Sequence, residues 1–200
     1  MLSEILKDYH IILASASPRR QQFFRDLGVP FEIRLKEVEE IYPERLRGSD
    51  IPDYLAQLKA LPFRDELREK EILITSDTIV WHLGRALGKP RSREEALDML
   101  RSLSGKDHKV ITSVCFTTKH LQKTVNSVTR VYFDHLTEDE MAYYTDTFKP
   151  YDKAGAYGIQ EWIGLTGIRK IEGSYFNVVG LPVHLVYHTL QTLIGHEPEK

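Results

Sequence analysis

The stretch IILASASPRRQQFFRDLG, residues 11–28, contains the pattern that decides the fold. Ile11–Ala14 is a short apolar run, which is typical of a buried strand. Ser17 is a good helix N-cap, Pro18 suits the first helical position, and Gly28 suits the position where a helix stops. The sequence therefore predicts a strand, a tight loop and a helix whose first turn carries polar and basic side chains.

A second decisive run is ILITSDTIV, Ile72–Val80, which is apolar except for four polar residues near its end. This pattern predicts a central strand. Further strands are expected at 31–34, 109–118 and 127–136, with helices at 53–60 (a helical pattern resuming over 64–70), 92–103, 137–148 and after Pro182 to 194. Ser92 with Glu95, and Thr137 with Glu140, have capping-box spacing. Strands and helices mix without strict alternation, so the fold class is α/β or α+β.

Length and composition exclude several classes of protein. The chain has 200 residues, 42% of them hydrophobic, which fits a single domain over 1–200. With 27 basic and 29 acidic residues, the net charge of −2 argues against a nucleic-acid partner, although a pocket can be basic when the surface is not. No run approaches the roughly 18 apolar residues of a membrane span. The single cysteine, Cys115, reads as a core residue, and a cytoplasmic location is the default expectation.

The segment SASPRR, residues 15–20, is the first candidate site. A helix N-terminus offers free backbone N–H groups and a partial positive charge, and the hydroxyls and arginines beside it suit a phosphate chain. The alternative is a well-capped helix with surface arginines. The segment lacks the glycine spacing of a P-loop.

Asp77 and Thr78, inside the apolar run, form the second candidate. An aspartate there is costly to bury unless it is paired, protonated or bound to metal, and such acids are often functional. The alternative is a strand-end aspartate that caps a neighbouring turn. Glu39-Glu40, in a polar loop, reads by itself as a solvated acid pair.

Three separated lysines, Lys59, Lys89 and Lys153, each read alone as surface residues. The segment DKAGAYGIQ, residues 152–160, predicts a tightly packed turn that ends in Gln160, a side chain able to read the edge of a base. The histidines show no zinc spacing, and no nucleophile-elbow motif is present. Carboxylates, cations and hydroxyls favour phosphoryl chemistry with a divalent ion.

Taken together, these segments resemble the Maf family. The matching pieces occur in family order along nearly the whole chain: LASASPRR (13–20), GVPFE (28–32), Tyr54 through Lys59-Ala60, SDTIV (76–80), GKP (88–90), EEALDMLRSLSGKDHKVIT (94–112), DKAGAYGIQ (152–160) and GSYFNVVGLP (173–182).

The resemblance implies a fold similar to that of the inosine triphosphate pyrophosphatases, with a long twisted mixed sheet, flanking helices and a cleft between two lobes. It implies hydrolysis of nucleoside triphosphates to the monophosphate and pyrophosphate with Mg²⁺ or Mn²⁺, as a housekeeping activity on the nucleotide pool. The GIQ ending resembles the branch that acts on dTTP and UTP. Dimers are common among such proteins, so the resemblance allows a homodimer.

Residue roles follow from the same match. Asp77 falls at the catalytic acid, and Arg19, Thr78 and Gln160 fall where that branch sets substrate choice. The other matching pocket positions are Ser15, Arg20, Glu40, Lys59, Lys89 and Lys153. Glu40 and Asp77 are the expected metal ligands, and whether Asp77 is the base, a ligand or both stays open.

The chain departs from the family pattern at Glu161, where a glycine is common, and at Leu61-Pro62 and Trp81-His82. These departures leave the catalytic set intact but bear on base preference. The alternative function is a non-catalytic nucleotide-binding regulator of cell division or septum formation. The retained Asp77 argues against that alternative, because a pure binder has no need of a costly acid beside phosphates.

Overall fold

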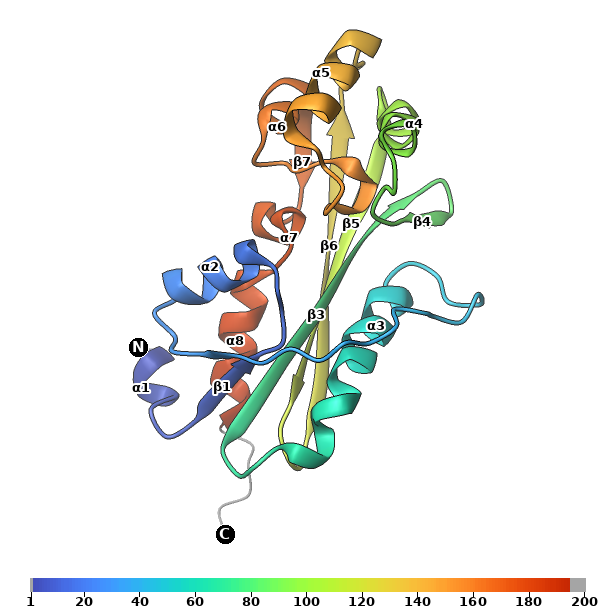
Figure 1. Ribbon diagram of the computed structural model, residues 1–200. Coiled ribbons are helices and arrows are strands. Elements are labelled where there is room, and N and C mark those ends of the chain that lie inside the picture. The colour runs from blue at the N-terminus through green and yellow to red at the C-terminus, as the bar shows by residue number, and fades with distance from the viewer. Residues whose placement is uncertain (1, 195–200) are drawn as a thin grey trace.

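The structure is a computed structural model that describes residues 2–194, and its centre is one seven-stranded mixed sheet (Figure 1). The strand order is β2-β1-β3-β5-β6-β7, with β4 paired to β3 outside this path. The strands are β1 (His10–Leu13), β2 (Glu32–Ile33), β3 (Glu71–His82), β4 (Arg85–Leu87), β5 (Asp107–Thr117), β6 (Gln122–Phe133) and β7 (Ile168–Glu172). β1 is parallel to β2 and β3, whereas β3, β5 and β6 form a long antiparallel ribbon.

Helices cover this ribbon at both ends. Figure 1 shows α1, α2 and α8 beside one half of the sheet, and α4, α5 and α6 at the other end. The helices are α1 (Leu2–Ile5), α2 (Pro18–Asp26), α3 (Asp50–Ala60), α4 (Arg93–Leu103), α5 (Glu138–Phe148), α6 (Trp162–Gly167), α7 (Tyr175–Val179) and α8 (Val183–Ile194), with 3₁₀ turns η1 (Leu61–Glu66) and η2 (Ala154–Ala156).

The alternation of side chains along β3 explains why this strand is central. Ile72 and Ile74 pack into the core beneath α1, α2 and α8, whereas Leu73 packs with Ala56 and Phe63 on the other side. Successive side chains of a strand point to opposite faces, so a strand covered on both faces needs a continuous apolar run. The prediction of a buried central strand from ILITSDTIV is confirmed.

A separate core lies at the other end of the ribbon. Val80 of β3, Val110 of β5 and Phe133 of β6 pack there with residues of α4 and α5. The polar residues at 75–78 of β3 lie between the two cores, which gives the molecule its two lobes. The predicted fold class, a long mixed sheet flanked by helices in two lobes, is confirmed. A single domain over 1–200 stays a prediction.

Several predicted boundaries were wrong. β6 begins at Gln122 and ends at Phe133, whereas a strand over 127–136 was expected. The hydroxyl of Thr118 accepts hydrogen bonds from the amides of His120 and Leu121, so the turn is short and the strand starts early. The missed helices and strands are all short: α1, β4, α6, β7 and α7.

The helical pattern expected over 64–70 ends at Glu66, because the chain turns there into β3. The carboxylate of Glu71 accepts a hydrogen bond from the Arg68 amide at 2.8 Å, which stabilises this turn. The capping box at Thr137 is complete. At Ser92 only half of the box forms, because the Glu95 carboxylate accepts from the amide of Arg91 instead.

Within residues 2–194, no helix has both the length and the apolar character needed to cross a membrane. Cys115 is fully buried, as expected of a core residue, and burial raises the pKa of its thiol.

Candidate active site

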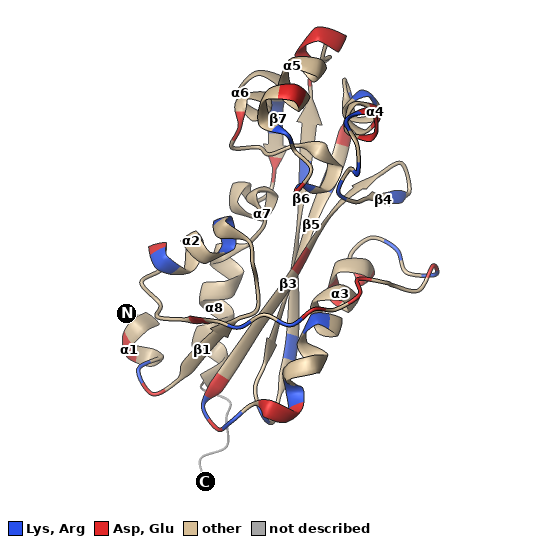
Figure 2. Cartoon of the chain, viewed as in Figure 1, with Lys and Arg blue, Asp and Glu red and all other residues tan. Residues whose placement is uncertain are grey.

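A cavity of about 340 Å³ lies where the two lobes meet. It brings together segments from α2, the loop after β2, α3, β3, β4 and the stretch 152–160. All the predicted site residues except Ser15 line it, namely Arg19, Arg20, Glu40, Lys59, Asp77, Thr78, Lys89, Lys153 and Gln160. Five of the lining side chains are basic and three are acidic, so the cavity is cationic although the whole chain carries −2. Figure 2 shows how few charged segments interrupt the middle of the long strands.

The start of α2 forms one wall of the cavity. Ser17 occupies the N-cap position as predicted, but its side chain makes no capping hydrogen bond, and the first turn contains no acidic residue. Ser15 is buried, and its hydroxyl accepts a hydrogen bond from the Ser17 amide at 3.3 Å. Ser15 therefore shapes the loop, while Ser17 lines the cavity. Uncapped amides at a helix N-terminus favour an anion.

Arg20 joins three segments that are far apart in the sequence. Its guanidinium donates to the carbonyl of Gly180 at 2.9 Å, to the carbonyl of Ser76 at 3.1 Å and to the hydroxyl of Thr78 at 3.0 Å. These bonds use three of its five N–H donors. Burial lowers the pKa of Arg20, against the opposing effect of Asp77. Arg20 thus acts as a clamp of the cavity wall as well as a buried positive charge.

The hydroxyl of Thr78 belongs to a chain of hydrogen bonds. Thr112 donates to the carbonyl of Asn177 at 3.1 Å, and the hydroxyl oxygens of Thr78 and Thr112 are 2.9 Å apart. A hydroxyl has one hydrogen, so Thr78 is the donor to Thr112. Since Arg20 already donates to Thr78, the hydroxyl of Thr78 can offer a ligand only its remaining acceptor position.

Asp77 is the most buried acid of the cavity, with a side chain that is 10% exposed. Lys59 of α3 reaches across to it, and the ammonium lies 2.6 Å from Asp77 Oδ1 and 3.0 Å from Glu40 Oε1. Burial raises the pKa of the Asp77 carboxyl, and the Lys59 and Arg20 cations oppose this effect. A carboxylate whose proton affinity is raised by burial is a better base near neutral pH.

The donor set can be tested for the metal that the resemblance implies. Among the described residues, no group of three or more His, Cys, Asp or Glu side chains could hold a metal ion. Glu40 and Asp77 nevertheless offer two hard carboxylates that share one ammonium. Magnesium is usually bound by one or two carboxylates together with substrate phosphates and water. The residues therefore fit an ion whose coordination the substrate completes.

The stretch 152–160 forms the opposite wall. Gly155 has a positive φ of 70°, and a Cβ at this position would approach the side chain of Val80 to 2.9 Å. This close packing on β3 brings Lys153 and Gln160 to the cavity. Within residues 2–194, the side chains of Lys89 and Gln160 make no hydrogen bond or ion pair, so both are available to a ligand.

Three polar residues that line the cavity were not among the predicted site residues. Asp152 is paired with Arg19 at 3.2 Å and with Lys153 at 2.6 Å. Tyr157 lines the cavity and shares a hydrogen bond of 2.6 Å with the buried His108. Tyr42 comes from the loop after β2. The DKAGAYGIQ match contained a signal for Asp152 and Tyr157, whereas nothing in the sequence around Tyr42 marked it.

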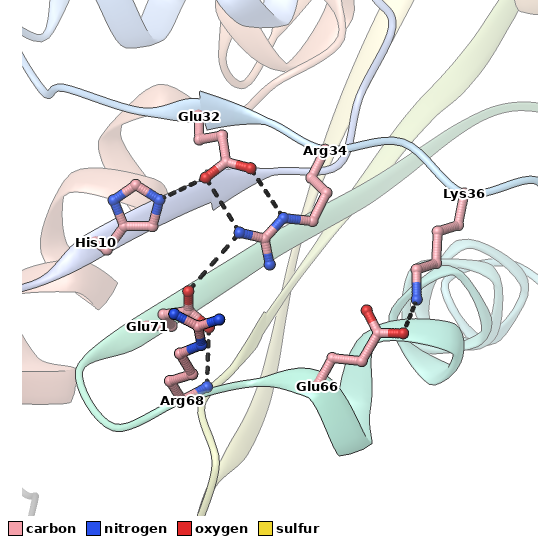
Figure 3. A network of polar contacts seen from close by, with 7 residues as sticks. All are labelled: His10, Glu32, Arg34, Lys36, Glu66, Arg68 and Glu71. Atoms are coloured by element: carbon pink, nitrogen blue, oxygen red, sulfur yellow. Dashed lines mark hydrogen bonds and ion pairs between the residues drawn. The ribbon is translucent and has the colours of Figure 1, made fainter.

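A second charged hollow lies at the base of the sheet, where β1, β2 and β3 meet (Figure 3). We call it the basal cluster, and it comprises His10, Glu32, Arg34, Lys36, Glu66, Arg68 and Glu71. Most of its charges are paired with one another: Arg34 with Glu32 at 2.9 Å, Glu32 with His10 at 2.7 Å, and Lys36 with Glu66 at 2.5 Å. The sequence analysis predicted no site here.

Known proteins are similar to this chain over most of its length. A family model described as Maf-like protein matches residues 10–193. A protein of Christiangramia forsetii named dTTP/UTP pyrophosphatase is 59% identical, over 98% of this chain and 100% of its own. A Flavobacterium johnsoniae protein of the same name is 57% identical, over 97% and 100%. A solved structure, the Staphylococcus aureus Ham1 protein, matches with a TM-score of 0.42 and 15% identity over 62% of this chain and 71% of that chain.

Proposed function

The chain belongs to the Maf-like protein family, and we propose that it hydrolyses dTTP and UTP to the monophosphate and pyrophosphate. The relatives that carry this activity in their names match the chain over nearly its whole length. The observation that carries the proposal is Asp77, a buried carboxylate bound to Lys59 at the edge of a cationic cavity. A cavity of this size is large enough for a nucleotide-sized ligand.

The polyphosphate binds at the start of α2. Uncapped amides, the helix dipole and Arg19 attract its negative charge there, and Lys89 and Lys153 add cations from the other lobe. Gln160 reads the base edge with an amide that both donates and accepts. Cations supplied by both lobes fix the phosphate chain in one orientation, which is a large part of catalysis in phosphoryl transfer.

Asp77 accepts a proton from the water that attacks the α-phosphorus. Its Oδ1 is bound to Lys59, which leaves Oδ2 as the oxygen available to water. Pyrophosphate leaves with the electron pair of the broken P–O bond, and Arg19, Lys89 and Lys153 stabilise the charge that develops on it.

Glu40 and Asp77 would hold a Mg²⁺ or Mn²⁺ ion together with phosphate oxygens. When bound, such an ion neutralises phosphate charge and acts as a Lewis acid toward the phosphoryl group. The role of the chain's own residues is to present two carboxylates to it. Lys59 bridges the two carboxylates, at 3.0 Å from Glu40 and 2.6 Å from Asp77.

A nucleotide panel tests the proposal. The purified protein is incubated with dTTP, UTP, CTP, ATP, GTP and 7-methyl-GTP in the presence of Mg²⁺ or Mn²⁺, and phosphate is measured with and without added inorganic pyrophosphatase. With dTTP and UTP we expect inorganic phosphate to appear when pyrophosphatase is added, and no phosphate to appear without it. In ¹⁸O-labelled water the label should enter the monophosphate, because attack occurs at the α-phosphorus.

Two outcomes would contradict the proposal. Phosphate released without pyrophosphatase would indicate cleavage at the γ-phosphorus. Binding of nucleotide with no product under any metal condition would favour the regulator that the sequence analysis kept as the alternative.

A further inference from the structure

Behind the wall of the cavity lies a carboxylate with no role so far. Glu161 follows Gln160 directly, does not line the cavity, and has a side chain that is 19% exposed. One of its oxygens, Oε1, lies 3.1 Å from the ammonium of Lys153, which is also paired with the neighbouring Asp152 at 2.6 Å. Within residues 2–194, only Glu161 links this ammonium to the stretch after Gly158. The other, Oε2, accepts a short hydrogen bond from the hydroxyl of Tyr144 on α5. Each oxygen therefore binds a different segment of the chain.

Tyr144 extends this contact to the backbone beside Gln160. Its hydroxyl accepts a hydrogen bond from the amide of Gly158 at 3.0 Å while donating to Glu161. Burial and the hydrogen bond to Glu161 raise the pKa of the Tyr144 hydroxyl, so it stays a donor at every physiological pH. The order of donors is thus fixed: Gly158 to Tyr144, and Tyr144 to Glu161.

The packing around Gly158 shows how close these groups are. A Cβ at this position would lie 2.9 Å from the carboxyl carbon of Glu161 and 3.0 Å from Nε2 of Gln160. The carboxylate of Glu161 and the amide of Gln160 therefore both lie beside Gly158, on the same side of the turn. A change at Glu161 is thus made close to the amide that would read the base.

Helix α6 holds the turn from the other side. Glu161 is the N-cap residue of α6, and its carbonyl accepts from the Gly164 amide at 2.9 Å. A Cβ at Gly164 would overlap the carbonyl oxygen of Ile159, so the helix packs directly on the backbone of the turn. This packing leaves the turn little freedom once Glu161 is fixed.

We propose that Glu161 is a positioning residue that fixes Lys153 and the Gly158–Gln160 turn relative to each other. This inference rests on the proposed function, in which Lys153 binds the polyphosphate and Gln160 reads the base. The two ends of a nucleotide must be bound at a fixed separation for the α-phosphorus to meet the attacking water. One carboxylate sets that separation by holding the phosphate-binding cation with one oxygen and the base-reading turn with the other.

Steady-state kinetics on UTP and CTP tests this inference with two variants. Glu161→Gln removes one of the two carboxylate charges beside Lys153 and leaves the other, that of Asp152, in place. Tyr144→Phe removes the hydrogen bonds to Gly158 and Glu161 without changing charge. We expect Glu161→Gln to lower kcat/KM for UTP by roughly 10- to 100-fold, mainly through KM, and to narrow the preference for UTP over CTP. Tyr144→Phe should narrow the same preference with a smaller loss, about fivefold. The double variant should lose less than the product of the two single losses.

Matched controls separate this role from a general loss of packing. Tyr143→Phe changes the adjacent tyrosine of α5, which is half-exposed and packs edge-on against Trp162. Glu94→Gln changes an exposed glutamate in the first turn of α4. Both controls should keep the wild-type preference between UTP and CTP, and melting temperatures show which variants are folded.

A second measurement needs no substrate. In ¹H–¹⁵N spectra of the free protein, the Gly158 amide should shift in Glu161→Gln and in Tyr144→Phe, but not in the controls. An unshifted Gly158 amide in both variants would overturn the inference, as would folded variants that lose equal rate on every nucleotide with KM unchanged. If the wild-type protein hydrolyses no nucleotide, the proposed function fails, and the Gly158 shift still decides whether Glu161 fixes the turn.

Discussion

Two acidic residues on the same strand have nearly the same burial and different surroundings. The side chain of Asp77, in the middle of β3, is 10% exposed, and that of Glu71, at its start, is 11% exposed. Asp77 lines the cavity between the lobes, whereas Glu71 belongs to the basal cluster. Burial of an acid in an apolar strand therefore does not by itself distinguish a site from a structural contact.

Their partners explain the difference. Glu71 accepts the amide of Arg68, three residues earlier, and lies 3.7 Å from the guanidinium of Arg34. This hydrogen bond joins the two ends of the turn that leads into β3, so the contact stabilises the turn. Asp77 binds an ammonium from another helix, beside uncapped amides and two side chains, Lys89 and Gln160, that have no partner within residues 2–194.

The difference between the two acids lies in whether the charges around them are already paired. In the basal cluster the three acidic side chains are all paired with cations of the cluster (Figure 3), and only the guanidinium of Arg68 has no ion pair within residues 2–194. In the cavity the basic side chains outnumber the acidic ones, so an anion still gains by entering. Unused donors next to a buried acid indicate a site, and the acid alone does not.

The largest effect should come from Asp77→Asn. We expect turnover of UTP and dTTP to fall on the order of 10³-fold, because the amide cannot accept the proton of the attacking water. The circular dichroism spectrum should be unchanged, because Asn has the shape of Asp. A rate near that of the wild-type protein would exclude Asp77 as the base. Asp77 would then be a structural acid, as Glu71 is.

Glu71→Gln is the matched experiment on the other acid. The free energy of unfolding should fall by about 1–3 kcal/mol, because charge-assisted hydrogen bonds at the turn are weakened. The kcat/KM for UTP should stay at the wild-type value, since Glu71 is remote from the cavity. Urea unfolding and the pyrophosphate assay measure the two quantities, and a loss of activity in a folded Glu71→Gln protein would contradict the distinction drawn between the acids.

The core behind the cavity and the basal cluster should lose stability in different pH ranges. Burial, and to a lesser degree His82, lowers the pKa of His108 from 6.5 to about 3. Hydrogen bonds from Arg34 and then His10 lower the pKa of Glu32 from 4.5 to about 2. In both cases the unfolded chain binds the proton more readily, so stability is lost as the pH falls. The loss linked to His108 begins below pH 6.5, and that linked to Glu32 begins below pH 4.5.

His108→Gln should therefore flatten the stability curve between pH 6.5 and 4.5, and Glu32→Gln should flatten it only at lower pH. Urea midpoints measured across this range provide the comparison. Identical curves for the two variants would show that the buried histidine behind Tyr157 and the exposed cluster do not titrate separately.

The smallest effect is expected at the rim of the basal cluster. Lys36 pairs with Glu66 at 2.5 Å, but the Glu66 side chain is 57% exposed. Exposed pairs of this kind contribute little, so Lys36→Met should change the free energy of unfolding by less than about 1 kcal/mol and leave catalysis unaltered. A larger loss in urea unfolding would indicate that the cluster acts as one network.

The sequence predicted the long elements and most of the polar residues that line the cavity. ILITSDTIV and IILASASPRR have local signals strong enough to place β3, β1 and α2, and the family resemblance brought Lys59, Lys89 and Lys153 together. Short strands such as β4 and β7 were not predicted, because they form by pairing with other strands and show no local periodicity of their own. Ser15 shows the same limit: which of two nearby hydroxyls lines the cavity depends on a loop conformation that no local pattern encodes.

The clamp formed by Arg20 has a consequence for how the protein is made. Its guanidinium is bound by the carbonyl of Gly180, near the far end of the chain. Until Gly180 has been synthesised, the guanidinium on α2 lacks one of its three acceptors. The cavity wall that Arg20 holds can therefore be completed only after translation has passed Gly180.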